Sequence, residues 1–430
     1  MWHTDLAGNM LTNPTGVVSG SSYALQALEG TFRQDVNGDG TIGLHVATIE
    51  QAGATALVQV ADRYALGGAS GPQIKFGGAP VTVDQFGAWA PVAAEAIAGG
   101  YEVAWKSGAD QYSVWNTDLA GNMLSNPTGV VSGSSYALES LEGSFHQDLN
   151  GDGTIGVVTT TIEQAGATAL VQVANTYALG DASGPSIKFG SAPVTVGQFG
   201  NWAPVAAEAI DGGYEVAWKS GADQYSVWRT DSDGNMLSNP TGVVSGESYA
   251  LQSMEPSFQQ DLNGDGMIGP LKTLIESSGS TALVQLADTY VLGGAPGPQI
   301  KFNGAPVTAG QFGDWAPIAA EAIDGGYEVA WKSGADQYSV WQTDLAGNML
   351  SNPTGVVSGS SSAVQMFEPS FQQDLNGDGT IGSTAATLQV FGQAVASSLV
   401  ADGPADSGQT IGLAVMAPPV QSDVLANPRG

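Results

Sequence analysis

The chain has 430 residues, and its 41 acidic residues against 11 Lys and Arg give a formal net charge of −30. This charge disfavours nucleic acid and anionic membranes as partners, because both attract basic surfaces. The sequence contains no cysteine, which excludes disulfides, zinc–thiolate sites and cysteine nucleophiles. No apolar stretch is long enough to predict a transmembrane helix. The N-terminus lacks the basic and apolar regions of a secretory signal peptide.

A repeat of about 113 residues organises the chain. It is marked by evenly spaced tryptophans at Trp2, Trp115, Trp228 and Trp341. A period of this length is typical of tandem domains with separate cores, and it is too long for a solenoid repeat. We predict the C-terminal fragment of a truncated unit at 1–43, full units at 44–156, 157–269 and 270–382, and a tail at 383–430. The apolar helix residues of the fragment 1–43 would then have no sheet of their own to cover.

The first full unit predicts three β-hairpins in chain order. Residues 55–60 and 63–68 form the first, 73–76 and 80–83 the second, and 100–115 the third, because apolar residues alternate there and turn residues separate them. A tight turn follows at 118–122. The predicted fold class is therefore α+β and mainly β, a tandem array in which each unit is a β-meander with one short helix and an acidic loop.

The helix is predicted over residues 136–145. Ser135 provides an N-cap, and Leu138, Leu141 and Phe145 are three or four residues apart, which places them on one face.

An acidic loop with the pattern D-x-N-x-D-G follows each predicted helix. This pattern is the front half of an EF-hand loop, and it is also dockerin-like. In such a loop, positions 1, 3 and 5 supply side-chain oxygens, a glycine at position 6 makes the turn, and position 7 supplies a carbonyl. Ca²⁺ is therefore the predicted cofactor. The predicted loop ligands are Asp35, Asn37, Asp39 and Thr41; Asp148, Asn150, Asp152 and Thr154; Asp261, Asn263, Asp265 and Met267; and Asp374, Asn376, Asp378 and Thr380.

The loops lack the acidic residue that closes an EF-hand at position 12. Two sets of glutamates recur nearby. Glu29, Glu142, Glu255 and Glu368 lie on the helices, and Glu50, Glu163 and Glu276 follow the loops. We favour the helix glutamates because all four loops have one, with water as a further ligand. Such a shell predicts a Kd of about 10⁻⁵–10⁻³ M, which suits an extracellular calcium concentration. The alternative is an acidic turn that binds no metal.

The string W-x-T-D-x-x-G-N…E-x-x-F-x-Q-D-[LV]-N-G-D-G-x-I-G follows FGxWAPxAAEAI…GYEVAWK, and together they cover residues 1–382. This pattern resembles the tryptophan-rich C-terminal domain of secreted cyanobacterial and proteobacterial proteins. The resemblance implies large extracellular proteins, often with calcium-binding nonapeptide repeats, enzymes or adhesion modules, and no activity of its own. The tail resembles an uncleaved signal for type I secretion.

The tryptophans are interpreted mainly as packing residues. Trp105 shares a strand face with Tyr101 and Val103, so we predict that it lies in the core. Trp115 falls on the more polar face of the partner strand, so we predict that it packs under the helix or against the next unit. A sugar-stacking platform at Trp115 is the alternative. Trp89 is predicted to lie in the core beneath a loop.

No catalytic residue is predicted. His3, His45 and His146 are replaced by other residues in the other copies. We therefore predict a non-enzymatic, secreted bacterial protein, extracellular or at the cell surface, that binds calcium and acts as an adhesin, a matrix component or an accessory region of a larger exoprotein. One alternative is a multivalent array of carbohydrate-binding modules with extracellular glycans as partners. A less favoured alternative is an unrecognised polysaccharide hydrolase.

Overall fold

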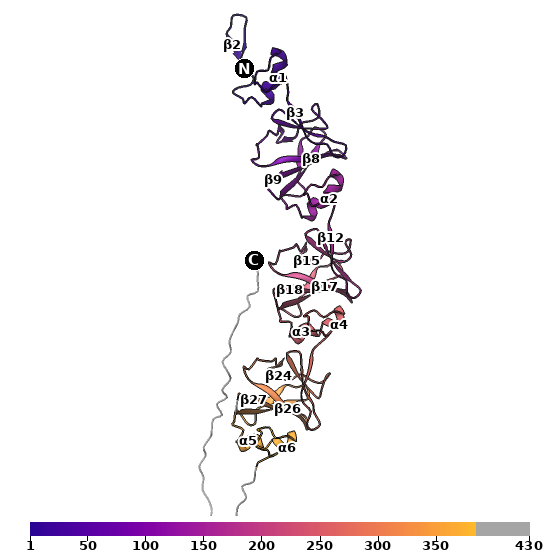
Figure 1. Cartoon of the computed structure of the whole chain (residues 1–430), viewed down its shortest axis with the longest axis vertical. Coiled ribbons are helices and arrows are strands. Elements are labelled where there is room, and N and C mark those ends of the chain that lie inside the picture. The colour runs from indigo at the N-terminus through magenta and orange to yellow at the C-terminus, as the bar shows by residue number, and fades with distance from the viewer. Residues whose placement is uncertain (335, 384–430) are drawn as a thin grey trace, which may run out of the picture. The chain divides into compact units, whose positions relative to one another are not determined.

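The computed structural model describes residues 1–334 and 336–383. Residues Met1–Ser383 form one compact unit, and 384–430, which make up nearly all of the predicted tail, lie outside the described residues. Three copies of one set of elements follow each other along the chain, coloured from purple to yellow in Figure 1. In the described part of the chain, no helix is long and apolar enough to cross a membrane.

The first full unit contains a three-stranded sheet, a two-stranded hairpin, a four-stranded sheet and a helix. All strand pairs in these sheets are antiparallel. The elements are β3 (Val46–Glu50), β4 (Leu57–Val60) and β5 (Arg63–Leu66); β6 (Lys75–Phe76) and β7 (Ala79–Pro80); β8 (Ala90–Ile97), β9 (Gly100–Ser107), β10 (Gln111–Asp118) and β11 (Met123–Ser125); and α2 (Tyr136–Phe145).

The same elements recur in the next two units, where two short helices replace the single one. The second unit contains β12 (Thr159–Glu163), β13 (Ala169–Val173), β14 (Thr176–Gly180), β15 (Lys188–Phe189), β16 (Ala192–Pro193), β17 (Ala203–Ile210), β18 (Gly213–Ser220), β19 (Gln224–Asp231), β20 (Met236–Ser238), α3 (Tyr249–Gln252) and α4 (Glu255–Phe258). The third contains β21 (Lys272–Glu276), β22 (Leu283–Leu286), β23 (Thr289–Leu292), β24 (Lys301–Phe302), β25 (Ala305–Pro306), β26 (Ala316–Ile323), β27 (Gly326–Ser333), β28 (Gln337–Asp344), β29 (Met349–Ser351), α5 (Ser362–Gln365) and α6 (Glu368–Phe371). The segment before the first full unit contains β1 (His3–Thr4), β2 (Met10–Thr12) and α1 (Tyr23–Phe32).

The predicted fold class and the three predicted hairpins are confirmed, as β4–β5, β6–β7 and β9–β10. The structure adds strands that the sequence did not indicate. The longest of these is β8, which pairs with β9 along its length and for which no element was predicted. Its run of alanines has low strand propensity. Ala93 and Ala94 are nevertheless both buried, on opposite faces of the sheet, because tertiary packing outweighs that propensity.

The four-stranded sheet is the middle layer of each unit, and both of its faces are buried. One face packs on the two smaller sheets, through Val103, Trp105 and Trp115 against Leu57 and Ile74. The other face packs on the helix and the start of the acidic loop, through a cluster of Ala93, Ala104, Tyr112, Val114, Leu138, Phe145 and Leu149. Successive residues of a strand point to opposite faces, so each strand contributes to both cores.

The predicted packing of Trp115 under the helix or against the next unit was wrong, because Trp115 packs in a core cluster of its own unit. In the antiparallel register Trp115 pairs with Val103, and Ser113 pairs with Trp105. Residues directly opposite one another project from the same face of a sheet. Trp115 therefore lies beside Trp105, with ring centroids 4.6 Å apart, on the face away from the helix.

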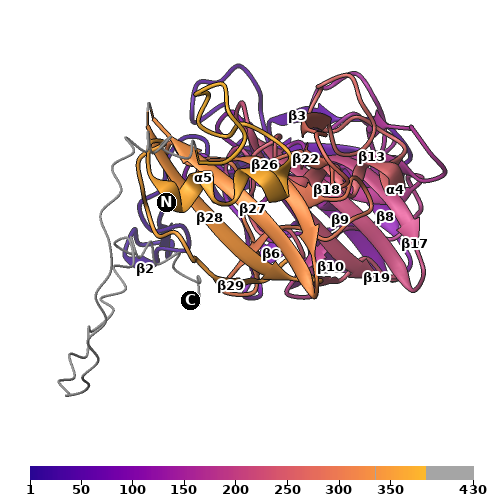
Figure 2. The same cartoon turned by 90° about the horizontal axis from the view of Figure 1, so that it is seen from below.

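The predicted helix is confirmed to the residue as α2. The Ser135 hydroxyl accepts a hydrogen bond from the Ala137 amide at 3.2 Å and caps it. In the second unit Pro256 replaces the glycine of α2, and the helix divides into α3 and α4, because proline cannot donate the backbone hydrogen bond of a helix interior. The third unit has the same division, and α5 and α6 pack against β28 and β26 (Figure 2).

Candidate metal loops and an aromatic pocket

Each acidic loop is closed by hydrogen bonds from its own backbone. In loop 148–156, Asp148 accepts from the amides of Gly151 at 2.6 Å and Gly153 at 2.8 Å. Both glycines have φ near +90° (83° and 93°), where side chains with a Cβ are strained. Asp152 accepts from the Thr154 amide at 2.8 Å. The same three bonds recur in the other three loops.

The loop offers oxygen donors of the kind that Ca²⁺ prefers. Two carboxylates, one carboxamide and one backbone carbonyl occur at positions 1, 3, 5 and 7, so the residues present fit part of a calcium shell of six to eight oxygens. Across residues 1–334 and 336–383, no three His, Asp or Glu side chains are grouped so that they alone could hold a metal ion. Asn37 and Asp39 of the first loop border a cavity of about 530 Å³.

The helix glutamate is fully buried and binds both ends of the loop. Glu142 has no exposed surface. One of its carboxylate oxygens accepts from the amides of Leu149 and Asn150, and the other accepts from Gly156 at 2.9 Å. The same arrangement holds at Glu29, Glu255 and Glu368. Because both of its carboxylate oxygens accept backbone amides, this residue fixes the loop backbone, whereas the sequence predicted it as the closing calcium ligand.

One loop differs from the others in its charge. Its neighbour Glu139 accepts a hydrogen bond from the Val158 amide at 2.9 Å. Burial raises the pKa of Glu139, and repulsion by Asp152 and Glu142 raises it further, against the opposing effect of the Val158 amide. The other three loops have glutamine at this position, and its side-chain amide donates to the aspartate at position 5. Loop 148–156 thus has one more carboxylate than its copies.

The helix and loop of one unit bond to the first hairpin of the next. The backbone amides at the start of α1, α2 and α3 each donate to a side chain in the first hairpin of the following unit. Tyr136 donates to Asn175 at 3.1 Å, and Tyr249 donates to Asp288 at 2.7 Å. The corresponding bond at the first junction joins Tyr23 to Asp62 at 2.9 Å. Each of these three helices, with the acidic loop that follows it, therefore lies beside the first hairpin of the next unit.

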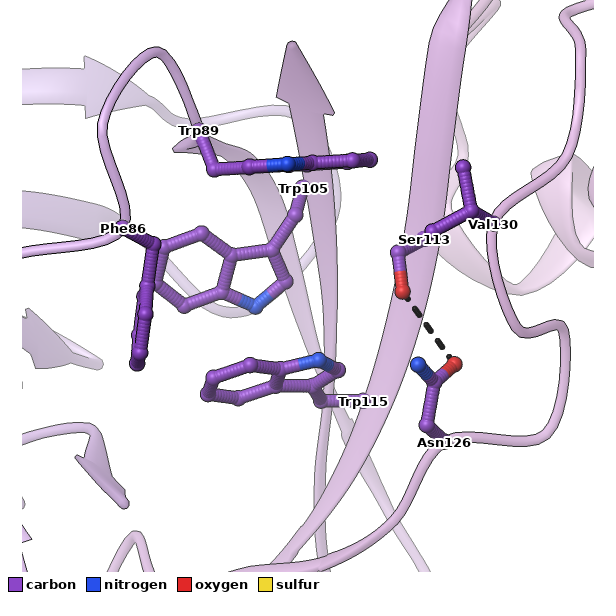
Figure 3. A pocket seen from close by; sticks show the side chains of 7 residues that line it. All are labelled: Phe86, Trp89, Trp105, Ser113, Trp115, Asn126 and Val130. Atoms are coloured by element: carbon purple, nitrogen blue, oxygen red, sulfur yellow. Dashed lines mark hydrogen bonds between the residues drawn. The ribbon is translucent and has the colours of Figure 1, made fainter.

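An aromatic pocket of about 210 Å³ opens on the face of the four-stranded sheet opposite the helix. In Figure 3 the Trp89 and Trp115 rings lie on opposite sides of Trp105, with a polar pair to the side. The pocket is lined by Phe86, Trp89, Trp105, Ser113, Trp115, Asn126 and Val130. Trp89 was predicted to lie in the core beneath a loop; it is half-buried and packs against the core cluster that contains Trp105, and it also lines this pocket. Sequence reasoning did not assign Phe86, Ser113 or Asn126 to a site, although all three recur in every full unit.

Three segments match the model of the tryptophan-rich Synechocystis species C-terminal domain, namely residues 55–156, 168–269 and 281–382. The chain belongs to this family. The tandem tryptophan-rich domains predicted from the sequence are thereby confirmed. The match does not test the calcium loops, which remain a prediction.

No curated protein sequence matches the chain. Similar solved structures include a prolyl endopeptidase (10% identity, 73% of this chain and 44% of that chain, TM-score 0.17). They also include prolyl oligopeptidase B from Galerina marginata (9%, 72% and 44%, TM-score 0.17) and the Dos1 propeller (13%, 72% and 69%, TM-score 0.14). The chain spans less than half the length of the two peptidases. Likenesses with such low TM-scores support no inference about activity.

Proposed function

We propose that this chain is a non-catalytic, calcium-binding repeat region of an extracellular bacterial protein, acting as an adhesin, a matrix component or an accessory region of a larger exoprotein. The observation that carries the proposal is the fourfold recurrence of one loop geometry, with the same oxygens at positions 1, 3, 5 and 7. These are oxygen donors of the kind that Ca²⁺ prefers, and each loop places two carboxylates among them. Ca²⁺ bound there neutralises part of the net charge of −30.

In this proposal some residues are calcium ligands and one residue holds the loop backbone in place. Asp148, Asn150, Asp152 and the Thr154 carbonyl are the protein ligands, and water completes the shell. Glu142 supports them by fixing the backbone at both ends of the loop. A shell with so few protein ligands implies weak binding, with a Kd of about 10⁻⁵–10⁻³ M, which only extracellular calcium would saturate.

The proposed role as an adhesin or matrix component rests on the repetition of one unit to which we assign no catalytic residue. The alternative predicted from the sequence, a multivalent carbohydrate-binding array, depends on the aromatic pocket and not on the loops. An unrecognised polysaccharide hydrolase remains the least favoured alternative. Turnover of polysaccharides by the full chain in millimolar Ca²⁺ is the result that would favour it.

Addition of Ca²⁺ is expected to raise the melting temperature of the full chain, and a chelator is expected to lower it. A ligand that binds only the folded state at about 100 times its Kd stabilises by about 2.7 kcal/mol per site. Calorimetric titration and thermal melts in 10 mM CaCl₂, a concentration about tenfold above the weakest expected Kd, measure both effects. Asp261→Ala should remove one site, whereas Asp211→Ala removes an exposed acid outside the loops and should remove none. If the titration shows no heat and the melting temperature does not shift at this concentration, the metal assignment is excluded.

Exchange of glutamate and glutamine beside the loops should change calcium affinity in opposite directions. Glu139→Gln is expected to weaken binding at loop 148–156 about tenfold, because a carboxylate a few ångströms from a divalent ion contributes on the order of 1–2 kcal/mol in a partly solvated site. Gln252→Glu should strengthen binding at loop 261–269 by a similar factor. Each is measured by calcium titration of a full chain in which only that loop is intact, the others having Asp→Ala at position 1. If each variant binds calcium with the same affinity as its parent chain, the extra carboxylate does not act on the ion.

A further inference from the structure

We propose that the aromatic pocket of each full unit binds one pyranose ring of a neutral glycan. This site lies on the face of the four-stranded sheet opposite the helix and the calcium loop. The proposal therefore goes beyond calcium binding and does not depend on it.

The size and walls of the pocket fit a single six-membered ring. Its volume is about 210 Å³, and a protein cavity of about 150 Å³ is enough to hold benzene. The Trp89 and Trp115 rings lie on opposite sides of Trp105 in Figure 3, and Phe86 stands across them at one end. The electron-rich face of an indole attracts partly positive hydrogens, and the C–H groups of a sugar ring are of this kind.

Buried polar groups at the wall distinguish a sugar from a purely apolar ligand. The indole N–H of Trp105 has no hydrogen-bond partner within the described residues, and the equivalent Trp218 and Trp331 share this property. Ser113 is 5% exposed and donates to Asn126 at 3.1 Å. In the second unit the equivalent Ser226 hydroxyl is buried without a partner. A buried donor without an acceptor is unfavourable, and a sugar hydroxyl supplies both acceptor and donor.

The charge of the chain and the lining of the pocket select a neutral ligand. A net charge of −30 repels sulfated or uronic glycans. No carboxylate lines the pocket, so a cation would gain only its interaction with the rings. A quaternary ammonium group is therefore the less favoured occupant, although aromatic cages elsewhere recognise it.

The aromatic arrangement recurs in all three full units. The ring centroids of the central pair are 4.6, 4.5 and 4.6 Å apart, at Trp105–Trp115, Trp218–Trp228 and Trp331–Trp341. The equivalent of Trp115 in the segment 1–43 is Trp2. It is 66% exposed, and it lines neither the aromatic pocket nor the cavity beside the first loop. Three weak sites on one chain allow a long glycan to bind more tightly than a single ring does.

The test is a titration of the full chain with cellohexaose, chitohexaose, mannohexaose and, separately, choline chloride, followed by tryptophan fluorescence and calorimetry. A ring of this size is expected to bind with a Kd near 1 mM, so each probe is taken to about 10 mM. The test variant has Trp→Ala at the three half-buried positions Trp89, Trp202 and Trp315. The matched control is Trp2→Ala, which removes a tryptophan outside the pockets.

The proposal is supported if at least one hexasaccharide binds, if the triple tryptophan variant binds it about tenfold or more weakly, and if Trp2→Ala binds it as the wild type does. A second triple variant tests the pocket without removing a tryptophan, so the proposal stays testable if the first variant does not fold. It has Val→Glu at Val130, Val243 and Val356, which are about 60% exposed (61%, 58% and 61%), and it should also weaken binding because it narrows the entrance. The proposal is overturned if no hexasaccharide binds, if binding is unchanged in both triple variants, or if only choline binds.

Discussion

Glu255→Ala is expected to destabilise the second unit by about 3 kcal/mol or more in the absence of calcium, because each buried amide without an acceptor costs about 1–3 kcal/mol. The Glu255 carboxylate is fully buried. It accepts from the amides of Leu262 at 3.0 Å, Asn263 at 3.4 Å and Gly269 at 2.9 Å. Alanine leaves all three donors without an acceptor and frees both ends of the loop.

Glu255→Gln separates hydrogen bonding from charge, because glutamine keeps one acceptor oxygen. Burial raises the pKa of Glu255, although the three amides partly oppose this rise. An acid with a raised pKa in the folded state stabilises below its unfolded pKa, and that stabilisation is lost as the pH rises through the folded pKa. The wild type should therefore lose stability through this group as the pH rises above about 4, the ordinary pKa of a glutamate. The glutamine variant should lack that share of the loss.

Hydrogen exchange of the full chain, resolved by mass spectrometry, measures the effect in one unit. Peptides that contain Arg229 distinguish β19 from its copies, which have other residues at this position. Faster exchange should be confined to the second unit, and Glu255→Gln should fall between wild type and Glu255→Ala. Unchanged protection of β19 in Glu255→Ala would mean that the loop amides are satisfied by water and that the glutamate is dispensable.

Phe258→Ala and Phe32→Ala should differ by several kcal/mol, although both residues occupy the same position of the repeat. Phe258 is 1% exposed and packs in a cluster with Tyr225 and Leu251. Its truncation leaves a cavity, and such changes cost about 3–5 kcal/mol. Phe32 is 53% exposed, because the sheet that its helix would cover is missing from the segment before the first full unit. Its truncation should change stability by no more than about 0.5 kcal/mol.

Urea unfolding of the full chain measures this pair of substitutions, with tryptophan fluorescence as the main probe. Phe258→Ala should produce an early transition that involves one unit, and Phe32→Ala should leave the curve unchanged. A large loss in Phe32→Ala would show that the segment 1–43 has a core that the sequence did not predict.

Local signals in the sequence were sufficient for the repeat, for the helix of the first full unit and for the positions of the loops. The period of the tryptophans located the units, and Ser135 with the spacing of Leu138 and Phe145 located α2 exactly as observed. Hairpins were predictable because their strands and turns are contiguous in the chain. The positions of the acidic loops were likewise visible from their own residues, whereas their metal remains a proposal.

Only the tertiary structure decided which side chains meet between strands. Alternation along β9 or β10 shows which residues share a face of one strand, but the register of pairing decides which faces of two strands coincide. That register places Trp115 beside Trp105 and away from the helix, and so builds the aromatic pocket. Packing of the two cores also buries both faces of β8, whose alanines favour no strand by themselves. The three amides that bind Glu142 likewise depend on the folded loop, because backbone donors have no signature in a sequence.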